Sequence, residues 1–234
     1  MAESKEKTYW TALESNPDTM NKLIKDIGVK GLRCEDIFGF DDDALAFVPQ
    51  PCYAVILCFP DYKKAYVYMR GSYEELKSKD YKNPDKVFFM NQKIGNACGT
   101  FSLLHSIANV RDKVNIGNGP FAQWIEKALP LGVMERSECL EKDEQMKKAH
   151  EESARSGETD LPIGNHVEHH FITYVNIDST LYEIDSSQEF ARPIGPTTPQ
   201  TMLHDAAKVI KDFMTKFESE SISFNAIAVV GAEQ

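Results

Sequence analysis

The chain of 234 residues is 42% hydrophobic and 26% charged, which is typical of a soluble globular protein and excludes the disordered and fibrous classes. Its 36 acidic residues outnumber its 26 basic residues, so the formal net charge is -10. Such a charge repels phosphate backbones and anionic lipid, and we expect no nucleic acid and no membrane among the partners. The longest apolar run is far shorter than the ~20 residues that cross a bilayer, and residues 1–7 contain no signal-peptide core. We therefore expect a cytoplasmic protein, whose small mass leaves entry into the nucleus open.

The five cysteines form an odd set with no C-x-x-C pair, which favours reduced thiols over a disulfide framework or a zinc site. Cys52 and Cys58 belong to an apolar run, where we expect them to be small buried side chains. We expect no metal and no cofactor.

In the first half of the chain, the apolar pattern predicts one helix and three short strands. The helix begins after Asn16 as its N-cap, has Pro17 at its first position and ends just before Gly28. Residues 53–59 are almost continuously apolar, which predicts a central strand buried on both faces. The other two strands are predicted over 66–69 and 87–90, with a charged surface loop over 74–86 between them.

In the second half, helical spacing of apolar residues predicts a largely buried helix that begins near Cys98 and ends by Asn109. Alternation on either side of Asp178-Ser179 predicts a β-hairpin over 170–177 and 181–185. The remaining predictions are helices over 121–129, 136–149 and 199–217, the last with Thr198 as its N-cap, a long exposed loop over 149–167 and a closing strand over 222–230. No linker or repeat divides the chain, so we predict a single α/β domain over residues 1–234, with a mostly antiparallel sheet and helices on its faces.

Cys98 is a candidate nucleophile because it lies where an irregular segment meets the start of a helix. The unpaired N–H groups and the positive end of the helix dipole favour a thiolate there. The amide of Cys98 has no helical acceptor and could donate to an oxyanion, and the side chain of Gln92 could supply a second donor. The alternative is that Cys98 is an ordinary core residue and Gln92 a loop cap.

His170 starts one strand of the predicted hairpin and Asp185 ends the other, so the hairpin can bring the two side chains together. The imidazole would then activate the Cys98 thiol, and the carboxylate would fix the imidazole tautomer. His166 and His169 could instead form a metal cluster with His170, but no acidic or cysteine ligand stands at a matching spacing.

These residues resemble the ubiquitin carboxyl-terminal hydrolases, which are papain-like thiol peptidases, in their short single-domain form. Residues 92–100, QKIGNACGT, are similar to the nucleophile signature of that family, and residues 170–172 and 181–185 are similar to its histidine and aspartate segments. Further similar segments follow in the same order over nearly the whole chain, at 13–17, 49–51, 150–159 and 224–228. There are two departures: Ala12 stands where proline is usual, and Ser186-Ser187 stand where the family has Gly-Arg after the aspartate.

The resemblance implies a papain-like fold and a deubiquitinating cysteine protease that hydrolyses the ester, thioester or (iso)peptide bond at the C-terminal glycine of ubiquitin. It implies Cys98 as nucleophile, His170 as general base and then general acid, and Asp185 as the residue that orients His170. Gln92 and the amide of Cys98 are then the oxyanion donors.

The resemblance also bears on partners. It identifies the loop over 149–167 with the family's crossover loop above the active site, so we expect small or unfolded leaving groups to be preferred. The expected partner is ubiquitin or a ubiquitin-like modifier. Because no extension follows Gln234 of the kind that docks longer members on the proteasome, we expect a monomer.

Three alternatives stay open at the level of the sequence. A ubiquitin-binding module with little or no turnover would result if the Ser186-Ser187 loop misplaced Asp185. The same three side chains could instead transfer an acyl group to a small amine. In the third alternative the chain is a structural domain in which Cys98 is inert.

Overall fold

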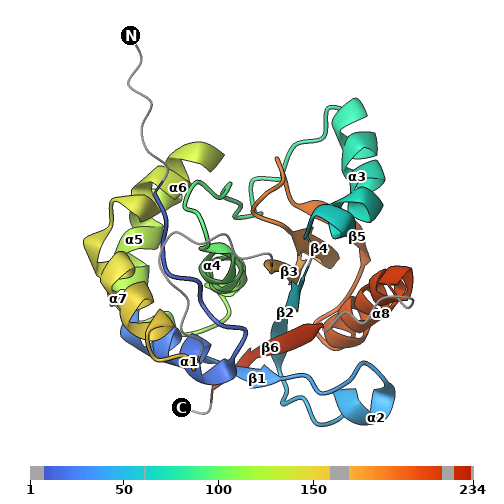
Figure 1. Ribbon diagram of the computed structural model, residues 1–234, viewed down its shortest axis with the longest axis horizontal. Helices are drawn as coiled ribbons and strands as arrows, with labels where there is room; N and C mark the ends of the chain where they lie inside the picture. Colours follow the sequence, from blue (N-terminus) through green and yellow to red (C-terminus); the bar gives the residue numbers. More distant parts are fainter. Residues whose placement is uncertain (1–7, 61, 159–168, 218–223, 233–234) are drawn as a thin grey trace.

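A computed structural model describes residues 8–60, 62–158, 169–217 and 224–232. These residues form a six-stranded sheet with helices on both faces (Figure 1). The strand order is β1-β6-β2-β3-β4-β5, where the strands are β1 (Leu32–Asp36), β2 (Cys52–Phe59), β3 (His170–Ile177), β4 (Thr180–Ile184), β5 (Arg192–Pro196) and β6 (Asn225–Gly231). Each pair of neighbouring strands is antiparallel, which confirms the predicted sheet type.

Strand β2 lies inside the sheet between β6 and β3 and separates two apolar cores. Successive side chains of a strand point to opposite faces, and those of β2 alternate between the cores, with Ala54, Ile56 and Cys58 in one and Val55, Leu57 and Phe59 in the other. All six are buried. The prediction of a central strand buried on both faces is therefore confirmed.

The helices close the two cores from opposite sides of the sheet (Figure 1). One core is closed by α1 (Pro17–Asp26), α4 (Cys98–Val110), α5 (Pro120–Ala128), α6 (Val133–Glu141) and α7 (Glu144–Ala154). The other is closed by α2 (Asp42–Leu45), α3 (Tyr62–Ser78) and α8 (Met202–Met214), which the short 3-10 helix η1 (Thr215–Phe217) follows. Helix α1 begins as predicted, because the Asn16 side chain accepts a hydrogen bond from the Asp18 N–H at 2.8 Å and Pro17 is the first helical residue.

Helix α4 runs through the middle of the first core. Of its 13 residues, only Asn109 is not buried, and the helix packs against β3 and β2. A helix that is buried around its whole circumference is covered by other elements on every side. The start of α4, and with it Cys98, is therefore held by the surrounding fold.

The sequence-based prediction is wrong for residues 66–69, 74–78 and 87–90, whereas residues 79–86 form the predicted surface loop. Residues 66–69 and 74–78 belong to α3, where Ala65, Met69 and Tyr73 are buried at helical spacing while Tyr66 and Tyr68 face solvent. The aromatic and β-branched residues of this segment favour strands in general, but here the helical stripe decides the structure. Residues 87–90 are buried but belong to no strand.

Several predicted boundaries also differ from the structure. The helix expected over 136–149 is two helices, α6 and α7, because the Asp143 side chain accepts hydrogen bonds from the N–H groups of Gln145 and Met146 and so starts a new helix. Helix α7 continues to Ala154, so the exposed loop does not begin at residue 149, and residues 159–168 of that loop lie outside the described residues. Helix α8 begins at Met202 instead of residue 199.

Three elements have no counterpart in the sequence-based prediction: β1, β5 and α2. Strands β1 and β5 are the two edges of the sheet and α2 is four residues long. Their sequences therefore show little of the apolar periodicity on which the predictions rest. Among the described residues, no helix is both long and apolar enough to cross a membrane.

Candidate active site

Cys98 is the first residue of α4, as the sequence predicts. It follows Ala97, whose side chain provides no cap, so the first N–H groups of the helix have no side-chain acceptor from the N-cap residue. The thiol is buried, with 8% of the residue exposed, and its Sγ lies 3.9 Å from the carbonyl oxygen of His169. Gly99 lets the backbone of Leu13 approach, since a Cβ there would lie 3.3 Å from the Leu13 carbonyl oxygen.

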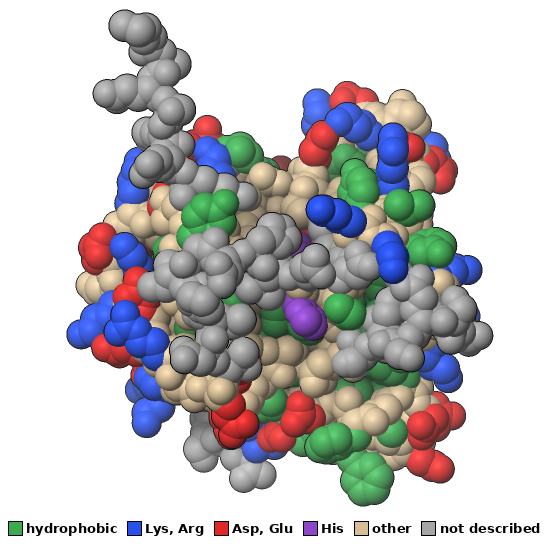
Figure 2. All heavy atoms as spheres, in the orientation of Figure 1, with side chains coloured by type: hydrophobic (Ala, Val, Ile, Leu, Met, Phe, Trp, Pro, Cys, Tyr) green, Lys and Arg blue, Asp and Glu red, His purple; other side chains and the backbone are tan. Residues whose placement is uncertain are grey.

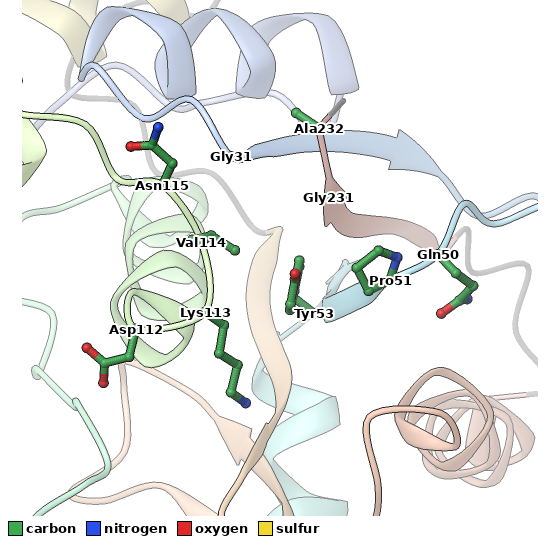
Figure 3. A pocket seen from close by; sticks show the side chains of 10 residues that line it. All are labelled: Gly31, Gln50, Pro51, Tyr53, Asp112, Lys113, Val114, Asn115, Gly231 and Ala232. Carbon is green, nitrogen blue, oxygen red and sulfur yellow. The ribbon is translucent and has the colours of Figure 1, made fainter. Parts of the chain in front are cut away.

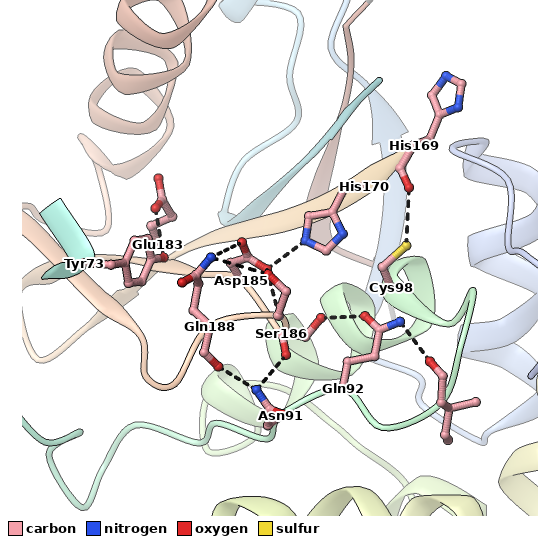
Figure 4. A network of polar contacts seen from close by, with 12 residues as sticks. Tyr73, Asn91, Gln92, Cys98, His169, His170, Glu183, Asp185, Ser186 and Gln188 are labelled. Carbon is pink, nitrogen blue, oxygen red and sulfur yellow. Dashed lines mark hydrogen bonds and ion pairs between the residues drawn. The ribbon is translucent and has the colours of Figure 1, made fainter. Parts of the chain in front are cut away.

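The predicted hairpin brings His170 and Asp185 together. Asp178 and Ser179 have positive φ values of 50° and 61°, as a two-residue turn of the hairpin type requires, and the register pairs Thr173 with Ile184. His170 Nε2 lies 2.7 Å from Asp185 Oδ1. The imidazole stands between that carboxylate and the Cys98 thiol (Figure 4), so Nε2 faces the aspartate and the other ring nitrogen is left for the thiol.

The electrostatics of this pair favour the ion pair over the neutral form. Burial lowers the pKa of His170, but the nearby Asp185 carboxylate, its hydrogen bond and the Cys98 thiol outweigh burial and raise that pKa above its ordinary value. Burial raises the pKa of Asp185, yet the His170 charge and the hydrogen bonds of His170 and Ser187 lower it overall. The charged form of His170 therefore stands beside the Cys98 thiol.

The loop after the aspartate holds Asp185 in place. Its Oδ1 accepts hydrogen bonds from the N–H of Ser187 at 2.8 Å and from the hydroxyl of Ser187 at 2.7 Å, in addition to His170. Its Oδ2 accepts from Gln188 Nε2 at 3.3 Å. Asp185 itself is fully buried, so these donors replace the water that a carboxylate needs. The sequence marked Ser186-Ser187 as a departure from the family pattern, and only the structure assigns the Ser187 contacts.

Gln92 lies against the same loop. Its N–H donates to the Ser186 carbonyl oxygen at 2.7 Å, and its side-chain Oε1 accepts from the Ser186 hydroxyl at 2.9 Å. Its Nε2 donates to the Ile94 carbonyl oxygen at 2.8 Å. The preceding Asn91 donates to the carbonyl oxygens of Ser186 and Gln188 at 3.2 and 2.6 Å. These bonds join the segment before Cys98 to the segment after Asp185 (Figure 4).

A second buried carboxylate, Glu183, supports the strand that carries Asp185. It accepts hydrogen bonds from the hydroxyls of Tyr73 and Tyr174, both at 3.0 Å. Arg192 binds it through two nitrogens, at 2.9 and 2.7 Å. Glu183 is 2% exposed, and donors from α3, β3 and β5 bind both oxygens of this buried carboxylate on β4. The carboxylate therefore connects the four elements.

The imidazole of His169, a member of the candidate metal cluster, does not join the site. His169 is exposed, as expected from its place on the opposite face of the strand from His170, and His166 lies outside the described residues. Within the described ranges, no group of three or more histidine, cysteine or acidic side chains could hold a metal ion. On the face shown in Figure 2, Lys, Arg, Asp and Glu side chains lie mainly around the rim, and histidine is visible near the centre.

A separate hollow of about 510 Å³ opens beyond the other end of α4 (Figure 3). Asp112, Lys113, Val114 and Asn115 line it, together with the start of β2 and the end of β6. Thirteen helical residues separate it from Cys98 by about 20 Å. It contains none of the four predicted site residues.

A buried thiol at a helix start, a histidine beside it and a carboxylate behind the histidine define the arrangement of a thiol-dependent hydrolase. The three side chains come from α4, from the start of β3 and from the residue after β4. Comparison with known proteins identifies the class more closely.

The family model for ubiquitin carboxyl-terminal hydrolase, family 1, matches residues 10–215. A ubiquitin carboxyl-terminal hydrolase of Drosophila melanogaster is 38% identical over 226 residues, which cover 96% of this chain and 99% of the relative. Ubiquitin carboxyl-terminal hydrolase 3 of Arabidopsis thaliana is 36% identical, with 97% of each chain covered. The isozyme L1 of Macaca fascicularis is 35% identical, with 94% of this chain and 97% of the relative covered.

Among solved structures, the catalytic domain of Trichinella spiralis UCH37 bound to ubiquitin vinyl methyl ester has a TM-score of 0.75 to this chain. The two are 23% identical, and 96% of each chain is covered. This likeness confirms the fold. The chain belongs to the ubiquitin carboxyl-terminal hydrolase family 1, as the sequence motifs predict.

Proposed function

We propose that this chain is a deubiquitinating cysteine hydrolase that cleaves the bond after the C-terminal glycine of ubiquitin. The observation that supports this most directly is that Cys98 at the start of α4 meets His170 and Asp185 of one hairpin, with His170 Nε2 2.7 Å from Asp185 Oδ1. The printed names of the relatives, which describe ubiquitin carboxyl-terminal hydrolases, support ubiquitin as the substrate.

In the first half of the reaction, the Cys98 thiolate attacks the carbonyl carbon of the C-terminal glycine of ubiquitin. The carbonyl oxygen becomes an oxyanion, which the amide N–H of Cys98 and the Nε2 of Gln92 stabilise by hydrogen bonds. The His170 imidazolium gives its proton to the leaving oxygen, sulfur or nitrogen, and the bond to the leaving group breaks. Asp185 keeps Nε2 of the ring protonated and fixes the ring plane throughout.

In the second half, His170 is neutral and acts as a general base on water. The resulting hydroxide attacks the thioester carbonyl, the carbon–sulfur bond breaks, and the thiolate of Cys98 and the protonated His170 are restored. The products are ubiquitin with a free carboxylate and the released group. Binding energy from the folded part of ubiquitin holds its extended tail against Cys98, so small esters without ubiquitin react poorly.

Leaving-group preference, oligomeric state and cellular compartment follow from the same function. We infer that small or unfolded leaving groups are preferred and that folded ubiquitin chains are cleaved slowly, as the resemblance of residues 150–159 to the family's crossover loop implies. A monomer of one domain over residues 1–234, in the cytoplasm and with access to the nucleus, fits this role in the ubiquitin conjugation pathway.

The test uses ubiquitin that carries a fluorogenic amide at its C-terminal glycine, with wild type and Cys98→Ala compared. We expect dye release by the wild type and none by Cys98→Ala, while both bind ubiquitin. A folded wild type that binds ubiquitin but releases no dye would refute hydrolysis and favour the binding module. Release of ubiquitin from a disordered peptide but not from a folded ubiquitin chain would support the expected leaving-group limit.

A further inference from the structure

We propose that Ser186 is a positioning residue for Gln92, so that its hydroxyl sets the orientation of the side chain that stabilises the oxyanion. The inference rests on the proposed hydrolase function. The Ser186 hydroxyl donates to Gln92 Oε1 at 2.9 Å, and both residues belong to the network that joins the segments before Cys98 and after Asp185 (Figure 4).

The hydrogen bonds of Gln92 fix which end of its amide is nitrogen. A backbone carbonyl oxygen can only accept, so the contact with the Ile94 oxygen at 2.8 Å identifies that atom as Nε2. Its partner Oε1 then faces the Ser186 hydroxyl, which can donate to it. The amide is therefore held at both ends, and the second hydrogen of Nε2 has a fixed direction.

The direction of that hydrogen matters because an oxyanion donor contributes through preorganisation. A donor that must turn toward the developing charge during the reaction loses part of its effect. The hydroxyl of Ser186 is well suited to prevent this turning, since Ser186 is only 1% exposed and water cannot easily replace it. A glycine, which the resemblance gives as usual at this position, has no group that could make the bond.

Ser186 also contacts the same segment through its backbone. Its carbonyl oxygen accepts from the N–H of Gln92 at 2.7 Å and from the Asn91 side chain at 3.2 Å. These two bonds do not depend on the side chain, so Ser186→Ala removes the hydroxyl contact while the loop keeps its backbone anchor. The variant therefore isolates the bond to Gln92 Oε1.

The experiment measures kcat and KM for ubiquitin with a C-terminal fluorogenic amide. We expect Ser186→Ala and Ser186→Gly to lower kcat by about three- to tenfold, the effect of one net hydrogen bond, with KM unchanged. Ser78→Ala serves as the matched control, because Ser78 is an exposed serine at the end of α3 that bonds only the Glu75 carbonyl oxygen in its own helix. It should keep the wild-type kcat.

Two further readouts separate positioning from a general structural effect. In a Gln92→Ala background, Ser186→Ala should cause no additional loss of kcat, because a residue that acts through Gln92 has nothing left to position. Alkylation of Cys98 by iodoacetamide displaces iodide and forms no oxyanion. Its rate should therefore be the same in Ser186→Ala as in the wild type, which also shows that the variant is folded.

Three results would overturn the inference. Ser186→Ala could keep the wild-type kcat, or it could lower kcat by the same factor in the Gln92→Ala background as in the wild type. In the third, Cys98 alkylation in Ser186→Ala is slowed as much as kcat. These are distinct from failure of the proposed function, in which the wild type itself releases no dye. An inactive wild type would refute both the proposed function and the role of Ser186. An active wild type with an equally active Ser186→Ala would refute only the role of Ser186.

Discussion

The buried carboxylate of Asp185 should control the reactivity of Cys98 through the charge of His170, and Asp185→Asn tests this. The substitution keeps the size of the side chain but removes its charge. Two unit charges about 4 Å apart interact by about 4 kcal/mol at the effective dielectric constant of about 20 that suits proteins. Losing this attraction lowers the pKa of His170 by about 3, from about 10 to about 7. The ring of the variant then loses its charge above pH 7, where the wild-type ring keeps it.

The assay follows the rate of Cys98 alkylation by iodoacetamide from pH 5 to pH 10. In the wild type, the His170 imidazolium beside the sulfur should favour its attack on iodoacetamide up to about pH 9. In Asp185→Asn, only about a tenth of the ring is charged one pH unit above a pKa of about 7, so most of this assistance is lost at pH 8. The rate at pH 8 should therefore fall by up to about tenfold.

Asp178→Asn provides the matched control for this experiment. It makes the same chemical change in the same hairpin, but at an exposed turn whose positive φ of 50° asparagine tolerates well. Its alkylation profile should match the wild type. If Asp185→Asn also alkylates at the wild-type rate between pH 7 and pH 8, the carboxylate does not maintain the imidazolium and the electrostatic reasoning is wrong.

Three further predictions concern stability and the other thiols. Glu183→Gln leaves Arg192 without its buried partner, so the free energy of unfolding should fall by about 3–5 kcal/mol, measured by urea denaturation, and a loss below about 1 kcal/mol would contradict the packing described. Burial lowers the pKa of His150 to about 4. In the unfolded chain this histidine takes up a proton near pH 6.5, so the free energy of unfolding should fall by about 3 kcal/mol between pH 6.5 and pH 4. In a His150→Gln variant the free energy of unfolding should fall less over that interval. Burial also raises the pKa of the Cys34 thiol, so mass spectrometry should find Cys34 unlabelled by iodoacetamide in the folded protein and labelled in urea.

Local patterns were enough to predict the central strand and the elements that carry the three reacting side chains. The buried run of β2, the helix that starts at Cys98 and the hairpin around Asp178-Ser179 each have a strong period or turn signal, and each is confirmed. The position of the turn did not decide whether His170 and Asp185 touch, because the hairpin register places Ile172, and not His170, directly opposite Asp185. The contact forms because Asp185 lies one residue beyond β4 and turns toward the start of β3.

The parts that could not be predicted depend on neighbours distant in the chain. Strand β5 contains two prolines and forms the edge of the sheet, where a missing N–H is tolerated but no apolar alternation results. The contacts of Ser186 with Gln92 join residues 94 positions apart, and nothing in either segment alone indicates them. In α3, by contrast, the buried stripe of Ala65, Met69 and Tyr73 was present in the sequence and was outweighed by β-forming residues.

The position of β6 has a consequence for how the chain becomes folded. Strands β1 and β2 are early in the sequence but do not pair with each other, because β6 lies between them and pairs with both. Before residues 225–231 are synthesised, β1 has no partner and β2 has one open edge. Such edges recruit other chains, so a nascent or shortened chain that ends at residue 224 should aggregate, and the sheet under Cys98 is completed only when its last strand leaves the ribosome.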